Sequence, residues 1–191
     1  MKLALALAAV SAMLAPAASA QAIDSIRIGV MDHNIKVTDG KNANKEDGVN
    51  INGELRFASP DFLKIIFSPH PYIMASVNTA GDTSYGGVGL EWDWEFAKGW
   101  HVEPGVGYVI HDGVKESPFP QGSQESFDYS QEHVFLGSRD LFRTSLAVTW
   151  DINETWAVQG IFEHLSHGQI LGNGRNQGLD ELGVRAVYRF Q

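Results

Sequence analysis

The sequence predicts an all-β fold, an eight-stranded antiparallel transmembrane β-barrel, and three observations lead to this prediction. Apolar and polar residues alternate with a period of two over long segments, which indicates strands with one apolar and one polar face. Eight such segments can be counted, and an even number of strands is typical of bacterial membrane barrels. Compact turns and long polar loops connect the segments, as expected where the two ends of a barrel face different compartments.

The segment before the first strand has the pattern of a secretory signal peptide. Lys2 is followed by an apolar run from Leu3 to Leu14 and by the small residues Ala18-Ser19-Ala20, a typical cleavage site. The apolar run is shorter than the roughly 20 residues that a membrane helix needs. We therefore expect residues 1–20 to be cleaved and residues 21–191 to form one barrel domain in the outer membrane of a Gram-negative cell.

Composition narrows the partners and the means of stabilisation. Cleavage after Ala20 removes one lysine and lowers the formal net charge from −9 to −10. Such an acidic chain is a poor partner for nucleic acid, which is itself a polyanion. The chain has no cysteine, so disulfides cannot stabilise it after export. A closed, hydrogen-bonded sheet would supply that stability instead.

The predicted strands and their connections can be placed along the chain. The strands span residues 25–34, 46–58, 65–79, 84–97, 100–111, 139–152, 155–167 and 179–190. The compact turns are Ala58–Lys64, Ala97–Gly99 and Asp151–Thr155. The long, polar connections lie at Lys36–Lys45, Asp112–Ser138 and Gly168–Gly178. The longest of these, rich in proline, glutamine and serine, has the composition of a mobile surface segment.

Alternation assigns a face to each residue, although a water-soluble barrel would show the same pattern with inside and outside exchanged. In the closing strand the apolar face ends in an aromatic residue, as is common in outer-membrane barrels, and consists of Leu182, Val184, Ala186, Tyr188 and Phe190. Aromatic residues near strand ends on the short-turn side predict an interfacial girdle of Trp92, Trp94, Trp100, Trp150, Trp156 and Tyr188. The girdle, the closing strand and the unequal connections favour the membrane barrel.

Charged residues on the opposite faces predict a paired polar network inside a narrow lumen that is not a pore. The predicted members are Glu54, Arg56, Glu91, Asp93, Glu95, Glu103, Arg143, Glu163, Arg185 and Arg189. His33, His111 and His133 lie at strand ends or in loops, where solvated histidines are ordinary. Their spacing supports no named metal, so no metal site is predicted.

Two polar residues end the lipid-facing stripe of the seventh predicted strand. His164 and Ser166 are in phase with the preceding residues Trp156, Val158, Gly160 and Phe162. Residues two apart on a strand are about 6.6 Å apart at the backbone, so the imidazole can reach the hydroxyl and act as its base. On the next strand Asp180 is in the same phase and can orient the imidazole, whereas Glu181 faces the interior. The competing interpretation is a polar collar at the level of the lipid headgroups.

The segment His164-Leu165-Ser166, followed by Asn176-Gln177-Gly178-Leu179-Asp180 and the closing strand, resembles the C-terminal signature of the PagL-type lipid A 3-O-deacylases. The resemblance implies an eight-stranded outer-membrane barrel with a Ser-His-acid site facing the outer leaflet. It implies hydrolysis of the ester-linked acyl chain at position 3 of lipid A without a cofactor. By this match Ser166 is the nucleophile, His164 the base and Asp180 the orienting acid.

The sequence departs from the family pattern at two positions. The family has asparagine directly after the serine, where this chain has His167, and an imidazole N–H can also donate to an oxyanion. His167 is therefore a candidate oxyanion donor or supporting residue. The family's acid is usually glutamate, and Asp180 is one methylene shorter. A bulge that shifts the register by one residue would make Glu181 the acid instead.

The sequence thus predicts a carboxylic ester hydrolase that acts on lipid A of lipopolysaccharide, with outer-membrane lipids as its surroundings. Two alternatives stay open: a non-catalytic structural or adhesion barrel, and an outer-membrane phospholipase with the same site. The departure at His167 favours the first alternative, and the retained phase of His164, Ser166 and Asp180 opposes it. Acyl-chain length and a homodimer are also left open by the sequence.

Overall fold

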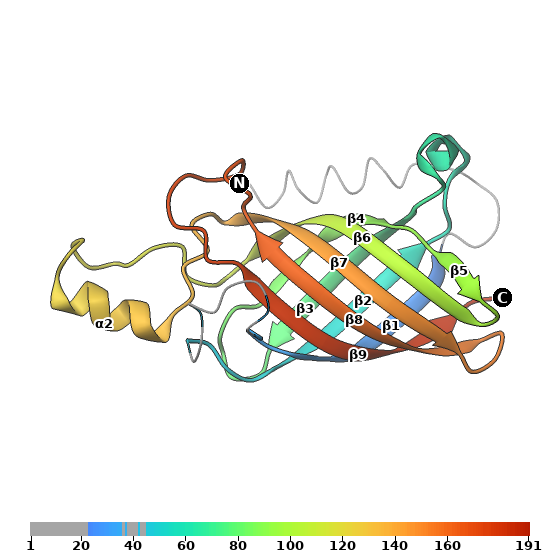
Figure 1. Ribbon diagram of the computed structural model, residues 1–191, viewed down its shortest axis with the longest axis horizontal. Coiled ribbons are helices and arrows are strands. Elements are labelled where there is room, and N and C mark those ends of the chain that lie inside the picture. The colour runs from blue at the N-terminus through green and yellow to red at the C-terminus, as the bar shows by residue number, and fades with distance from the viewer. Residues whose placement is uncertain (1–22, 36, 38–41, 43–44) are drawn as a thin grey trace.

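A computed structural model describes residues 23–35, 37, 42 and 45–191 of the chain. The predicted signal peptide, residues 1–20, lies outside the described residues. The described chain forms a closed antiparallel β-barrel with a helix projecting from one end (Figure 1). The predicted fold class is therefore confirmed. No helix in the described part of the chain has the length and apolar character required to cross a membrane.

The barrel wall is built from strands that each pair antiparallel with their neighbours. They are β1 (Ile23–Asp32), β2 (Val49–Phe57), β3 (His70–Asn78), β4 (Tyr85–Glu91), β5 (Trp94–Ala97), β6 (Trp100–His111), β7 (Asp140–Asp151), β8 (Trp156–Ser166) and β9 (Leu179–Arg189). Pairing of β1 with β9 and of β4 with β6 closes the sheet. Because β4 and β5 share the place of one predicted strand, 84–97, the barrel has eight strands.

Strands β2 and β3 begin later than the sequence predicts. Gly48 precedes β2 with a φ of 98°, a left-handed conformation that glycine adopts without strain. Ile65 and Ile66, expected to begin β3, instead belong to the 3-10 helix η2 (Asp61–Ile66). The helix ends at Phe67, whose φ of 67° reverses the chain, and the Trp92 indole donates to the Ile66 carbonyl at 2.8 Å. The connection between β2 and β3 is therefore an ordered helical turn at the short-turn end of the barrel.

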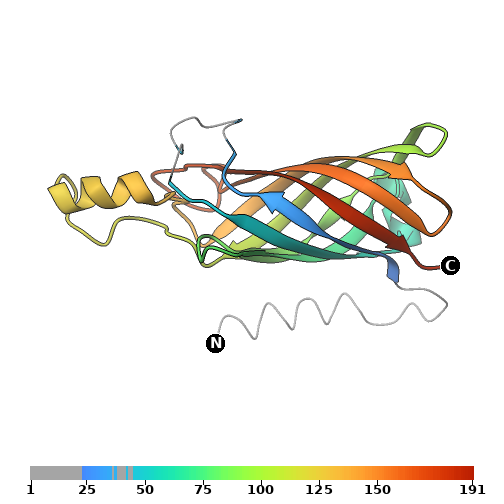
Figure 2. The same ribbon diagram turned by 90° about the horizontal axis from the view of Figure 1, so that it is seen from below.

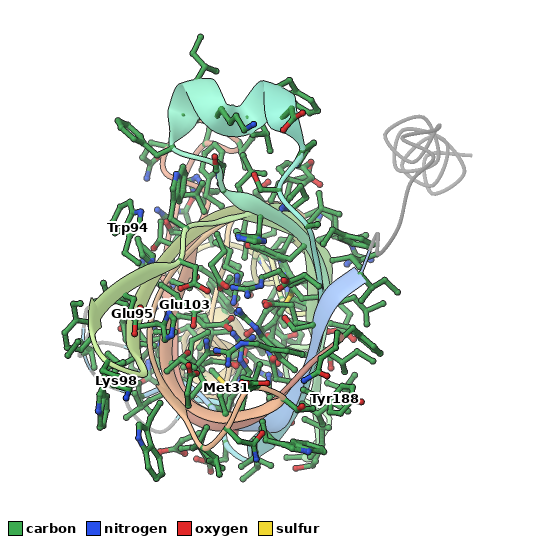
Figure 3. The ribbon with its side chains drawn as sticks, turned by 90° about the vertical axis from the view of Figure 1, so that its right-hand side faces the viewer. Met31, Trp94, Glu95, Lys98, Glu103 and Tyr188 are labelled. Carbon is green, nitrogen blue, oxygen red and sulfur yellow. The ribbon has the colours of Figure 1, made fainter. Side chains whose placement is uncertain are left out.

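The predicted alternation between lipid-facing and lumen-facing residues is present in the wall. In β7, Leu146 is 53% exposed, whereas the adjacent Ala147 is 1% exposed. Aromatic residues meet in pairs on the outside near the short turns, with ring centroids 6.1 Å apart for Trp100 and Trp150. Viewed along the barrel, Glu103 lies within the ring of strands and Trp94 outside it (Figure 3). These positions agree with the predicted girdle.

One residue of the predicted lumen network is misplaced by the sequence analysis. Glu95 is exposed, and its carboxylate accepts a hydrogen bond from the Gly99 amide at 2.9 Å. The physical reason is that β5 pairs only with β6, so this short hairpin extends beyond the closed part of the wall. Alternation in that hairpin therefore does not separate lumen from lipid.

Buried charges fill the lumen as a connected set of ion pairs. Arg27, absent from the predicted network, donates to Glu103 at 2.6 Å and to Glu54 at 3.1 Å, and it also bonds Glu91. Arg143 makes two bonds to Glu163, at 2.8 and 2.6 Å. Other ion pairs among the described residues of the lumen include Arg185–Glu54, Arg143–Glu54, Arg56–Glu91, Arg56–Asp93 and Arg56–Glu103. Arginines and carboxylates from β1, β2, β4 and β6 to β9 thus pair with one another inside the barrel.

The long-loop end of the barrel is closed by the segment between β6 and β7. Leu136 is fully buried against the upper lumen, and its amide donates to the Val114 carbonyl at 3.0 Å. The same segment contains the helix α2 (Gln124–Glu132), which the sequence analysis did not predict. Its first turn is capped by the Ser123 hydroxyl, which accepts from the Ser126 amide at 3.1 Å. Figure 2 shows α2 and the long loops at one end and the short hairpins at the other.

The first prediction concerns Arg27, which forms ion pairs with three buried acidic side chains. Arg27→Met should lower the free energy of unfolding by about 3 kcal/mol or more, because it leaves Glu54, Glu91 and Glu103 without their shared cation. The matched control is Arg189→Met. Arg189 is partly exposed and pairs with Asp151, so its loss should cost less than about 1 kcal/mol. Guanidinium unfolding in detergent micelles, followed by circular dichroism, measures both, and equal losses would contradict the proposed importance of the lumen network.

Candidate active site

A histidine and an aspartate face each other across β8 and β9 on the outside of the barrel. His164 and Asp180 are directly opposite in the antiparallel register. The His164 Nδ1 atom lies 2.6 Å from Asp180 Oδ1, the distance of a short, charge-assisted hydrogen bond. The His164 side chain is 26% exposed and that of Asp180 only 3%. The register therefore brings together the predicted base and the predicted acid.

Ser166 is the last residue of β8 and leaves the strand on the same face as His164. It is half-buried and pairs in register with Phe142 of β7. With Nδ1 directed to the carboxylate, the imidazole presents Nε2 as a proton acceptor. Residues two apart on one face of a strand are about 6.6 Å apart at the backbone, a spacing that allows the Ser166 hydroxyl to approach that nitrogen.

The segment before β9 holds the imidazole in place from one side. A Cβ atom added to Gly178 would lie 2.5 Å from His164 Cε1, so the ring packs directly against the glycine backbone. The Asn42 side-chain amide donates to the Gly178 carbonyl, and the Ile35 amide donates to the Asp180 carbonyl at 2.9 Å. In the sequence, Gly178 stands out only as the end of a long connection and as part of the family signature. The structure shows that this glycine makes room for the ring.

The alternative acid, Glu181, is not brought to His164. Its carboxylate lies in the lumen and is completely buried. It accepts hydrogen bonds from the Tyr85 hydroxyl at 2.8 Å and the Asn50 amide at 2.7 Å, and it lies 2.8 Å from His33 Nδ1. The register between β8 and β9 is regular, without the bulge that would exchange the two acids.

His167 is also on the lumen side, so its side chain does not join Ser166 and His164. The imidazole is fully buried: Nδ1 accepts from the Gln169 amide at 3.1 Å, and Nε2 lies 3.4 Å from the Arg175 carbonyl. Its backbone amide donates to Asn176 Oδ1 at 3.2 Å. These contacts connect the beginning of the loop between β8 and β9 with its end.

His33 was expected to be an ordinary solvated histidine, and this expectation is wrong. Its ring is buried between Glu181 and Glu46, with His33 Nε2 3.0 Å from the Glu46 carboxylate. Glu46 also accepts hydrogen bonds from the Val134 amide at 3.2 Å and the Thr83 amide at 3.4 Å. His33, Glu46 and Glu181 therefore form a clasp, the His33 clasp, that connects three loops to β9. Sequence periodicity carries no signal for such a contact between loops.

The other two histidines, at the end of β6 and after α2, differ from His33 and from each other. His111, expected to be solvated, is buried and lies 2.6 Å from the Ser138 carbonyl through Nε2, because the closing segment covers it. His133 is half-buried and stacks on Tyr129 with ring centroids 3.9 Å apart. Within the described ranges, no group of three or more histidine, aspartate or glutamate side chains has the arrangement of a metal site.

The charges of the His33 clasp determine its pH dependence. Burial by itself would lower the pKa of His33, but the hydrogen bonds to Glu181 and Glu46 outweigh it and raise the pKa to about 9. Burial would raise the pKa of Glu46, but the bonds with His33 and Thr83 lower it below its usual value. The histidine contribution is thus complete below its usual pKa of 6.5 and is lost as the pH rises through about 9. The Glu46 contribution is lost at the acidic end instead.

The second prediction follows from the direction in which the His33 contribution to stability changes with pH. His33→Gln stays neutral, so its deficit in unfolding free energy relative to wild type should be largest near pH 6 and should shrink towards pH 10. The raised pKa sets the change at no more than about 3 kcal/mol. Guanidinium unfolding at both pH values measures the difference, with His133→Gln as a loop histidine outside the clasp. A deficit that stays constant with pH would show that His33 is not charged in the folded protein.

Comparison with known proteins places the barrel in a family. The family model described as lipid A 3-O-deacylase (PagL) matches residues 63–189. The crystal structure of the outer membrane enzyme PagL superposes with a TM-score of 0.57 and 14% identity, covering 88% of this chain and all of that one. A designed transmembrane β-barrel has a TM-score of 0.51 and 8% identity, covering 90% of this chain and 98% of the design.

No match was found among curated proteins. At these identities the two structural similarities concern the fold alone. The family match is stronger evidence of relationship, because it extends over most of the chain and includes β3 to β9 with the His164–Asp180 pair. The chain is a member of the PagL lipid A 3-O-deacylase family.

Proposed function

We propose that this protein hydrolyses the 3-O-linked acyl ester of lipid A in the outer leaflet of the outer membrane, by a serine-histidine-aspartate mechanism. The observation that carries the proposal is the hydrogen bond between His164 and Asp180 on the outside of the wall, with Ser166 on the same face. Membership of the deacylase family supports the choice of substrate. Export by the signal peptide and long loops directed outwards complete the proposed location.

In this mechanism the Ser166 hydroxyl oxygen attacks the carbonyl carbon of the ester while His164 Nε2 takes its proton. Asp180 stabilises the resulting imidazolium through Nδ1. The tetrahedral intermediate collapses, the bond to the sugar oxygen breaks, and His164 returns the proton to that oxygen. Water then attacks the acyl-serine with His164 again as the base, which releases the 3-hydroxy fatty acid and restores Ser166.

The wall beside the site is suited to acyl chains. Below His164 the lipid-facing stripe continues through Phe162 and Val158, and on β9 through Leu182 and Val184. These apolar residues lie on the outer surface, with Leu182 52% exposed. A lipid that stays in the leaflet can therefore present an ester near its headgroup to Ser166 while its chains remain beside the strands. The enzyme needs no enclosed tunnel for such a substrate.

Burial of Asp180 favours catalysis over the polar collar and over a non-catalytic structural or adhesion barrel. Residues of a collar are expected to stay hydrated among headgroups, because removal of a carboxylate from water is costly unless it is paired. Asp180 is almost completely buried and its partner His164 is partly exposed. This arrangement orients one imidazole nitrogen and leaves the other towards the membrane. An outer-membrane phospholipase would use the same groups, and the choice of lipid substrate in the test separates the two.

For His167 we propose a supporting role in place of oxyanion donation by its ring. Its imidazole and backbone amide connect Gln169, Arg175 and Asn176, so it fixes the loop that follows the nucleophile. Exchange of this histidine for the family's asparagine would remove the ring contacts. We expect such a variant to alter the loop more than the chemistry of Ser166.

The third prediction concerns Ser166. Purified wild-type protein in detergent should release 3-hydroxy fatty acid from lipid A, and Ser166→Ala should abolish this release while the barrel still folds, because a small outward side chain contributes little to packing. His164→Ala should have the same effect, since an unactivated hydroxyl is a poor nucleophile. Mass spectrometry of the lipid A product measures the loss of one acyl chain.

A parallel assay with a phospholipid substrate distinguishes a deacylase from a phospholipase. A phospholipase would turn over the phospholipid faster than lipid A. Heat-modifiable migration on gels is the control for folding of each variant. Unchanged lipid A deacylation by folded Ser166→Ala would reject the mechanism and favour a non-catalytic structural barrel.

The fourth prediction compares the two adjacent acids. Asp180→Asn keeps the shape but removes the charge that stabilises imidazolium, so it should lower kcat by roughly 10³- to 10⁴-fold. Glu181→Gln should chiefly lower stability, because Glu181 is held by His33, Asn50 and Tyr85 in the lumen. Deacylation kinetics and guanidinium unfolding of both variants give the ranking. The reverse ranking would mean that Glu181 orients the catalytic histidine.

A further inference from the structure

A recess of about 380 Å³ lies at the long-loop end, between the helix α2 and two loops. Its lining includes Lys45, Phe127 and Ser130, together with the consecutive residues Arg175, Asn176 and Gln177. Lys45 precedes β2, Phe127 and Ser130 belong to α2, and residues 175–177 lead into β9. Three segments far apart in the sequence thus meet here, beyond the end of the wall in Figures 1 and 2.

The charge of the recess is unusual for this acidic chain. Two of its lining residues, Lys45 and Arg175, are cationic, and none of its lining residues within the described ranges is acidic. The Arg175 guanidinium lies over the Phe135 ring, 5.2 Å from the centroid, which leaves its N–H edge directed away from the ring. In the part of the chain that the structure describes, no carboxylate lies within ion-pair distance of Arg175. The side-chain NH₂ groups of Asn176 and Gln177 add hydrogen-bond donors to the lining.

The recess shares a wall with the candidate active site. Asn176, which lines the recess, accepts the hydrogen bond of the His167 amide, and His167 directly follows Ser166. Two residues after Asn176, Gly178 packs against the His164 ring. The Gln177 side chain accepts from the Phe135 amide at 2.8 Å, which fixes the segment against the closed end of the lumen. A molecule with its ester at Ser166 would therefore have its more polar end near Lys45 and Arg175.

We infer that Lys45 and Arg175 bind a phosphate group on the sugar of the lipid that the candidate site hydrolyses. This inference rests on the proposed function and adds to it a headgroup-binding site. Lipid A is a phosphorylated glucosamine disaccharide, so a phosphate and the ester at position 3 are carried by the same polar end of the molecule. Guanidinium and ammonium groups are the usual protein ligands of phosphate, and the guanidinium can bind two of its oxygens at once. The apolar ring of Phe127 is available to the face of a sugar.

The test compares lipid A that carries its phosphates with the same lipid A after enzymatic dephosphorylation. The double variant Lys45→Gln/Arg175→Gln should raise KM for the phosphorylated lipid on the order of tenfold, with kcat within about twofold. For the dephosphorylated lipid the variant and wild type should have the same KM. The matched control is Arg139→Gln, which removes an exposed arginine of the same end of the barrel that does not line the recess. It should leave both KM values unchanged.

A binding measurement makes this test independent of catalytic turnover. Equilibrium binding of each lipid to detergent-solubilised Ser166→Ala protein, with and without the double substitution, should show the same tenfold dependence on phosphate. Binding that depends on phosphate and on the two cations, without hydrolysis by wild type, would reject the proposed function and support the recess. Equal weakening for both lipids, or none, would overturn the recess as a phosphate site. Inorganic phosphate at millimolar concentration tests whether the recess binds the free ion and not the phosphate of the lipid. Binding of the free ion, with lipid affinity unaffected by the double substitution, would also overturn the inference.

Discussion

The pleat of β9 determines how this barrel separates its stability from its chemistry. Asp180 and Glu181 are adjacent, and in a strand adjacent side chains point to opposite faces. Asp180 therefore meets His164 on the outside, whereas Glu181 enters the lumen and joins His33, Asn50 and Tyr85. A slip of one residue would exchange the two carboxylates and place the apolar face of the strand in the polar lumen. The same constraint that orients the apolar wall thus fixes which acid serves the histidine.

Interactions on the two faces of the wall are connected by the loop between β1 and β2. Ile35 and Asn42 bind the backbone of Asp180 and Gly178, next to the outward site. From the same loop, His33 and Glu46 hold Glu181 and the segment that closes the lumen. The position of the candidate triad is therefore a property of the closed barrel and its loops together. Lower in the lumen, Arg27, Arg143 and Arg185 keep the strands in register from within.

Regular alternation made much of this structure predictable. Strand number, the faces of β7 to β9 and the pairing of His164 with Asp180 all follow from a period of two and antiparallel neighbours. The same reasoning failed where the chain leaves the sheet: Ile65 and Ile66 looked like strand but form η2, and Glu95 lies outside the lumen because its hairpin is open. Burial of His33 and the inward direction of His167 depend on loops that meet only in the folded protein. No local pattern encodes such contacts, and a capping serine at position 123 was the one local sign of α2.

The central claim is that the His164–Asp180 pair activates Ser166 on the lipid-facing wall. Labelling with a long-chain alkyl fluorophosphonate, followed by peptide mass spectrometry, tests it most directly, because this reagent phosphonylates activated serines. The account predicts one adduct, on Ser166, in folded wild-type protein, and its loss in His164→Ala. An adduct on another serine, or labelling of Ser166 that persists unchanged without His164, would contradict the account.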